Sequence, residues 1–136
     1  MGLAERRATK EFQDNHLPGL LSEIKAVIGM DVPIEIKWDT LAIEDQGHLY
    51  NECWTKVYFT PLINALKSIT ADELSKEALQ AGLKKITIQN TTGSYSGYSW
   101  ASFQAGELIL DHLPTTNVDD INDRTNGLVT ALEKGL

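Results

Sequence analysis

Three runs with the hydrophobic period of β-strands lie close together in the C-terminal half of the chain. In KKITIQN, residues 84–90, isoleucines alternate with polar residues, and YSWASFQAGELILDH, residues 98–112, reads as two strands joined at Ala105-Gly106. Parallel neighbours need a crossover of a dozen or more residues, usually a helix, and these runs are too closely spaced to hold one. The spacing therefore predicts that the three strands pair in antiparallel fashion.

The N-terminal half shows mainly the 3.6-residue period of helices. Apolar residues recur at helical spacing over 3–28, but Pro18 interrupts the run and predicts a kinked helix or two short ones. A half-buried strand follows over 32–38, and helical spacing returns over 44–69. Pro61 is compatible with a kink inside that second helical region and with the start of a new helix.

Capping signals mark the two remaining helices. Thr70 and Glu73 have capping-box spacing ahead of a helix that ends near Leu83, and Thr116 or Asn117 is placed to cap a C-terminal helix. The order is therefore helix, strand, two helices, three strands, helix. It predicts an α+β fold in which a mostly antiparallel four-stranded sheet carries helices on one face and leaves the other face open.

Length and composition fit one globular domain that spans residues 1–136. With 12 Lys and Arg against 19 Asp and Glu, the net charge is −7, which repels phosphate backbones and argues against nucleic acid as a partner. The N-terminus MGLAERRATKEF has no apolar h-region, so we expect a cytoplasmic protein. Apolar residues at 42% and charged residues at 23% are ordinary globular values and argue against membrane contact. Cys53 is the only cysteine, so no internal disulfide can form.

The most site-like row consists of residues spaced by four, namely Glu44, His48, Glu52 and Lys56. On one helix they would lie along a single face, as metal ligands sometimes do. An exposed stripe with a Glu52–Lys56 pair is the better interpretation, because helical zinc motifs use two histidines with a placed glutamate. We therefore expect no metal. Since the sequence also has no nucleotide or other cofactor motif, we expect no cofactor.

A small, hydrolase-like enzyme is the alternative function. His112 follows Asp111 at the end of the last predicted strand, where a carboxylate can hold an imidazole for acid–base work. Adjacent strand residues point to opposite faces, however, which weakens that pairing. Such an enzyme would need a fold that brings His48, Glu52 and His112 together.

The stretch NTTGSYSGYSW, residues 90–100, places Tyr95, Tyr98 and Trp100 among small polar residues and glycines. If the following strand turns its apolar residues to the helices, its alternation puts Tyr98 and Trp100 on the open sheet face. Alternatively, Trp100 faces inward and the tyrosines only cover the hairpin edge. The first arrangement predicts a non-catalytic binding or protein-interaction domain that uses Tyr95, Tyr98 and Trp100 to contact a protein partner or, in a homodimer, a second copy of the chain.

Overall fold

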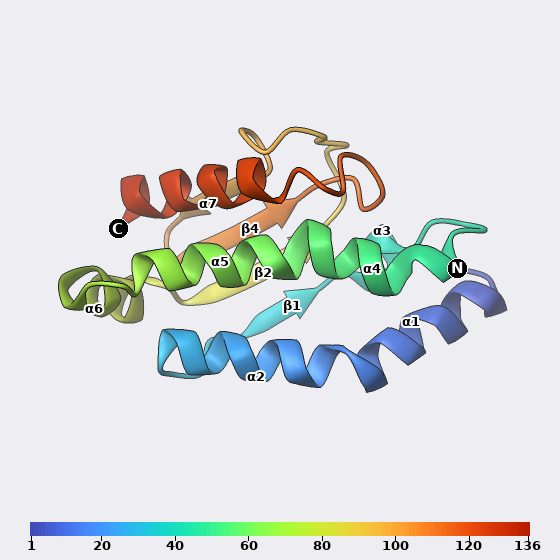
Figure 1. Ribbon diagram of the computed structural model, residues 1–136, viewed down its shortest axis with the longest axis horizontal. Coiled ribbons are helices and arrows are strands. Elements are labelled where there is room, and N and C mark those ends of the chain that lie inside the picture. Colours follow the sequence, from blue (N-terminus) through green and yellow to red (C-terminus); the bar gives the residue numbers. More distant parts are fainter.

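The computed structural model describes residues 1–136 and has an α+β architecture, in which helices pack on a four-stranded sheet (Figure 1). The strands are β1 (Ile34–Ile36), β2 (Lys85–Gln89), β3 (Ala101–Gln104) and β4 (Glu107–Asp111). The helices are α1 (Leu3–Asn15), α2 (Leu17–Ile28), α3 (Trp38–Leu41), α4 (Tyr50–Trp54), α5 (Thr60–Ile69), α6 (Glu73–Gly82) and α7 (Ile121–Gly135). A 3-10 turn, η1 (Gly47–Leu49), and a π-turn, η2 (Thr55–Phe59), flank α4. The predicted α+β class is confirmed.

The sheet is mixed and mostly parallel, so the predicted antiparallel arrangement is wrong. The strand order is β1-β2-β4-β3, with β1 parallel to β2, β2 parallel to β4, and only β3 antiparallel to β4. Strands that follow each other in the sequence need not be neighbours in the sheet. Residues 90–100 carry the chain past the position of β4 to the sheet edge, and the β3–β4 hairpin then returns β4 to the place beside β2. The connection from β2 to β4 is therefore long enough for a parallel pair.

The hairpin that joins β3 to β4 turns where the sequence predicts it. Ala105 and Gly106 have φ angles of 53° and 81°, so both central residues adopt the left-handed region that a tight hairpin turn requires. A Cβ atom on Gly106 would also lie 3.1 Å from the carbonyl oxygen of Gly82. Glycine is thus needed at position 106 for its conformation and for the close approach of the last residue of α6.

Helices α2, α5 and α7 lie across one face of the sheet (Figure 1). The sheet contributes Ile86, Ile88, Leu108 and Leu110 to the core, and all four are fully buried against helical residues. Trp54 is also fully buried in this core, whereas Trp38 and Phe103 are only partly buried. None of the helices combines the length and the apolar composition needed to cross a membrane.

Several element boundaries differ from the predicted ones. The first helical region is two helices, and Pro18 occupies the first turn of the second, as the sequence allowed. The first strand stops at Ile36, because Trp38 already begins α3. Helix α6 is capped by Asp72 rather than Thr70, since the Asp72 carboxylate accepts the Ser75 N–H at 2.8 Å. The last helix begins only at residue 121.

A continuous helical segment runs from η1 to the end of α5, and Pro61 lies inside it, directly after the π-turn. The N–H of Thr60 donates to the carbonyl of Thr55, five residues back. Pro61 has no N–H to offer to Val57, its partner in an α-helical register. The π-turn and the proline together therefore leave the carbonyls of Lys56 and Val57 free to accept hydrogen bonds from elsewhere.

Candidate functional site

Residues 90–100, called the tyrosine loop below, connect β2 to β3. The last of these residues, Trp100, is only 1% exposed, and its indole Nε1–H donates to the backbone carbonyl of Arg124 at 2.9 Å. Its ring meets the imidazole of His112 edge to face, with the ring centroids 6.2 Å apart. Of the two orientations that the sequence allowed, the structure has the inward one. Trp100 is therefore a core residue and is not accessible to a partner.

Tyr95 and Tyr98 have the opposite environment. Their side chains are 65% and 85% exposed, and they are the only aromatic residues among the exposed large hydrophobic residues of the chain. Both lie on the tyrosine loop rather than on a strand. Two of the three predicted site residues are thus displayed to solvent, and they are close in sequence.

The sheet face opposite the helices is polar, so it is not the predicted aromatic face. Lys85 Nζ lies 2.7 Å from the carboxylate of Glu35 across β1 and β2. The hydroxyl of Thr87 donates to the Glu107 carboxylate at 2.7 Å across β2 and β4. The prediction extended the strand alternation back to Trp100, whereas β3 begins only at Ala101. The aromatic side chains therefore belong to the loop and the core.

Asp111, at the end of β4, holds the first part of the tyrosine loop. Its carboxylate accepts the N–H and the hydroxyl of Thr91 at 2.9 and 2.6 Å, and both donors of Thr92 at 3.2 Å. Gln89 adds a bond of 3.0 Å. Burial alone would raise the pKa of Asp111, but these hydrogen bonds, with Thr91 foremost, outweigh it and hold the pKa below its ordinary value. The loop is therefore fixed where it leaves the sheet.

Two contacts with the segment around α7 hold the middle of the loop. The side-chain amide of Asn117 donates to the carbonyl of Tyr95 at 2.7 Å. Gly97 lies directly against α7, because a Cβ atom added to Gly127 would come within 1.9 Å of the Gly97 carbonyl oxygen. Only two facing glycines permit this approach. Together with Trp100, these contacts set the position from which both tyrosines project.

Arg124 on α7 lies beneath the loop in a cage of backbone carbonyls. Its side chain is fully buried, and its guanidinium donates to the carbonyls of Val57 (3.1 Å), Lys56 (3.2 Å), Asn117 (2.6 Å) and Val118 (2.6 Å). Two of these acceptors are the ones that the π-turn and Pro61 leave free. Burial lowers the pKa of Arg124, but a guanidinium stays charged in proteins. Arg124 thus joins the central helix, the loop before α7 and, through Trp100, the tyrosine loop.

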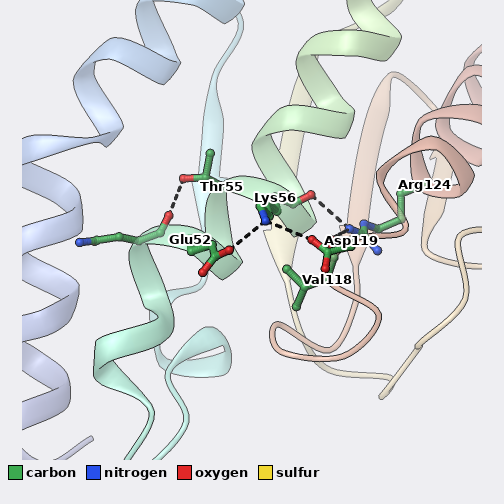
Figure 2. Close-up of polar contacts among 7 residues, drawn as sticks. Glu52, Thr55, Lys56, Val118, Asp119 and Arg124 are labelled. Carbon is green, nitrogen blue, oxygen red and sulfur yellow. Dashed lines mark hydrogen bonds and ion pairs between the residues drawn. The ribbon is translucent and has the colours of Figure 1, made fainter.

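Lys56 forms an exposed ion-pair cluster beside this cage (Figure 2). Its Nζ lies 2.8 Å from Glu52 and 3.0 Å from Asp119, and these hydrogen bonds raise the pKa of Lys56. The predicted Glu52–Lys56 pair is therefore confirmed. Glu44 lies ahead of the helix, so the predicted row of four does not form in full. No group of three or more His, Cys, Asp or Glu side chains is arranged to hold a metal ion.

The residues of the alternative enzyme site lie in separate environments. His48 is exposed and lines a hollow with residues of α1, while Glu52 is paired with Lys56. His112 is fully buried, with its Nδ1 2.6 Å from the carbonyl of Leu113 and no partner for its Nε2. No hydrogen bond or ion pair joins any two of His48, Glu52 and His112.

Arg124 is the important residue that the sequence analysis missed, although the sequence carried a signal for it. It stands four and eight residues before Leu128 and Leu132, the two leucines that α7 buries. A charged residue in a buried helical row needs several hydrogen-bond acceptors. The proline inside the apolar helix, Pro61, marks where unpaired carbonyls occur.

Comparison with known proteins finds no matching family model, no matching curated protein and no matching solved structure. The chemistry of the tyrosine loop and its surroundings is therefore the basis for a functional proposal.

Proposed function

We propose that this protein is a non-catalytic protein-interaction domain that binds its partner through Tyr95 and Tyr98. One observation carries the proposal: the only two exposed tyrosine, tryptophan or phenylalanine side chains lie three residues apart on a loop that is held at Thr91, Tyr95, Gly97 and Trp100. Large amphipathic side chains displayed in this way supply both apolar contact area and hydroxyl groups for hydrogen bonds.

The composition and order of the loop suit recognition of a protein surface. Around the tyrosines, the sequence SYSGYS combines the residue types that antibody loops use, with tyrosine as a large contact residue and serine and glycine as small adaptable neighbours. Ordering a flexible loop on binding costs free energy, and a loop already fixed by the Asp111 carboxylate and by α7 avoids much of that cost. Because the loop is already ordered before binding, less free energy is lost in forming the complex and the affinity is higher.

The charge distribution favours a basic partner. The chain has a net charge of −7, and Asp119, Asp120 and Asp123 lie where α7 begins, beside the tyrosine loop. Opposite charges on a partner would speed its approach and align it with the loop. Binding should therefore weaken as salt concentration rises, since exposed charges are screened.

The proposal is tested by replacing both tyrosines with serine. Leu74→Ser is the matched control, because Leu74 is 80% exposed on α6, away from the loop. Proteins captured from a native lysate by the wild-type domain are identified, and their affinities for the wild type and for the two variants are measured. We expect the double variant Tyr95→Ser/Tyr98→Ser to lose at least tenfold in affinity, as interface hot spots do, and Leu74→Ser to bind like wild type.

Light scattering on the same variants checks self-association, the second form of protein interaction that the tyrosines would support. If a homodimer forms through the loop, the double variant becomes monomeric while its far-ultraviolet spectrum is unchanged. A double variant that keeps both its assembly state and its partner affinity would contradict the proposal.

A further inference from the structure

The sheet has two free edges, and they differ in how they are protected. Edge strands are commonly guarded against pairing by charged residues and proline. The β1 edge has such protection, because Pro33 precedes the strand and Glu35 and Lys37 lie in and after it. The β3 edge, Ala101–Gln104, contains neither a charged residue nor a proline.

The backbone of β3 offers two sets of unpaired groups to solvent. The N–H of Asp111 donates to the carbonyl of Trp100 at 2.8 Å, which makes this cross-strand pair a hydrogen-bonded one. In an antiparallel ladder such pairs alternate with pairs whose backbone N–H and carbonyl groups point away from the partner strand. Ala101 and Phe103, opposite Leu110 and Leu108, therefore direct their N–H and carbonyl groups to the outer edge.

A groove of about 340 Å³ follows this edge, between β3 and α7. Tyr98 lies at the start of the groove, and Lys134 lies at the end where Phe103 approaches the last turn of α7. Between them α7 presents only small side chains to the groove, with Gly127 and Ala131 among them. The groove thus has room for side chains of a strand placed next to β3.

We infer that β3 receives an extended segment of the partner protein as a fifth strand, with a basic side chain at the Tyr98 end and an acidic side chain at the Lys134 end. This inference rests on the proposed function and gives its binding mode. Asp123 is one helical turn before Gly127 on the same side of α7, and neither Asp123 nor Lys134 is ion-paired within the chain. Tyr98 adds a ring face for the basic group.

A second copy of this chain does not fit the same edge. Helix α7 packs on β3 itself, at the margin of the sheet. Pairing two β3 strands about a two-fold axis would place two α7 helices on the same face, about 5 Å apart, which is one strand spacing. Packed helices need about 8–10 Å between their axes. A segment that carries no helix avoids this clash.

The dimensions define a probe. Eleven residues separate Asp123 from Lys134, which is about 16 Å along the helix axis, and seven strand residues span about 20 Å between their first and last Cα atoms. The probe is the capped peptide with sequence RTVTVTE. Its arginine, valines and glutamate share one face, toward α7, while its threonines face the polar side of the sheet.

Binding is followed by two-dimensional amide NMR of the protein during titration with RTVTVTE. We expect the largest shifts at Ala101 and Phe103, and slower hydrogen exchange of these two amides in the complex. Two modified peptides distinguish strand pairing from other contacts. In one the backbone nitrogens of the valines are methylated, and in the other the backbone nitrogens of the threonines are methylated. One of these two peptides should bind at least tenfold more weakly and the other nearly normally, because alternate N–H groups face β3.

Protein variants test the same contacts. Ala101→Pro removes one outward N–H and should weaken RTVTVTE at least tenfold, while Leu74→Ser, on α6 and outside the groove, should not change binding. Asp123→Asn and Lys134→Gln should each weaken it about two- to fivefold, as expected for exposed ion pairs.

The inference is overturned if 1 mM RTVTVTE produces no shifts at β3, or if both methylated peptides bind like the parent. These outcomes are separate from failure of the proposed function. If the tyrosine substitutions abolish partner binding while RTVTVTE fails to bind, the loop is an interaction site and strand addition at β3 is wrong.

Discussion

Replacing Arg124 by methionine tests whether the carbonyl cage holds the fold together. Methionine keeps an unbranched side chain of similar length but cannot donate hydrogen bonds. The substitution leaves the carbonyls of Lys56 and Val57 without the donor that compensates for the π-turn and Pro61. It also frees the carbonyls of Asn117 and Val118 ahead of α7.

The expected loss in the free energy of unfolding depends on how well water can replace the guanidinium as a hydrogen-bond donor. The Arg124–Val57 bond is buried, so its carbonyl would lose its partner outright, at about 1–3 kcal/mol. The other three bonds are partly buried, and hydration of their carbonyls would recover much of the loss. Removing the guanidinium also removes the free-energy cost of burying its charge, and this offsets a further part of the lost stability. We expect Arg124→Met to lower the free energy of unfolding by about 2–4 kcal/mol.

Urea unfolding followed by tryptophan fluorescence measures this loss. The matched control is Arg7→Met, an exposed arginine on α1, which should change the free energy of unfolding by less than about 0.5 kcal/mol. A double-mutant cycle with Pro61→Ala identifies the cause. Alanine restores an N–H that can reach Val57, so Arg124→Met should cost about 1 kcal/mol less in that background. An equal cost in both backgrounds would refute the reasoning from unpaired carbonyls.

Three further predictions concern burial and pH. Trp54→Ala should lower the free energy of unfolding by about 3–5 kcal/mol in urea, because the ring is fully buried and stacks on Tyr50 with centroids 4.2 Å apart; a midpoint like that of wild type would contradict this. Burial lowers the pKa of His112, so the unfolded chain takes up the proton first and stability should decline as pH falls below about 6.5; His112→Gln should lose this component. Because the pKa of Asp111 is lowered in the folded protein, its carboxylate contributes fully to the free energy of unfolding above about pH 4, and this contribution is lost as the pH falls further. Asp111→Asn should remove this pH dependence and speed amide exchange at Thr91 and Thr92.

The sequence predicted the elements better than their arrangement. Hydrophobic period identifies a strand such as Lys85–Gln89 because one face of it is buried, and this local property is visible in the chain. Strand order in the sheet depends on the path of each connection between strands. The sequence of residues 90–100 does not indicate that this connection passes the position of β4. The error in strand direction therefore came from equating neighbours in sequence with neighbours in space.

The candidate site was partly predictable for a similar reason. An exposed Tyr98 and a buried Trp100 have comparable local sequence contexts, and what separates them is a tertiary partner, the Arg124 carbonyl. Asn117 was predicted as a possible helix cap, yet its side chain binds the carbonyl of Tyr95, far away in the sequence. Loop anchors of this kind are set by tertiary contacts, so they leave little trace in hydrophobic period.

The facing glycines Gly97 and Gly127 allow a test of whether order in the tyrosine loop matters for binding. Within a helix, Gly→Ala ordinarily stabilises by about 1 kcal/mol, and Gly19→Ala on α2 should do so, because no atom beyond its sequence neighbours and the surrounding helix backbone lies within 4 Å of its added Cβ. Gly127→Ala would instead place a Cβ 1.9 Å from the Gly97 carbonyl oxygen and displace the loop.

We expect Gly127→Ala to destabilise the protein by about 1–3 kcal/mol, as overpacking does. It should also speed amide exchange across residues 94–100 and weaken partner binding while leaving Tyr95 and Tyr98 in the chain. Affinity would then depend on where the tyrosines are held as well as on their presence, as pre-organisation requires. If Gly127→Ala gains stability like Gly19→Ala and keeps the loop amides protected, the close approach does not constrain the loop, and the tyrosines are positioned by the contacts of Asp111, Asn117 and Trp100.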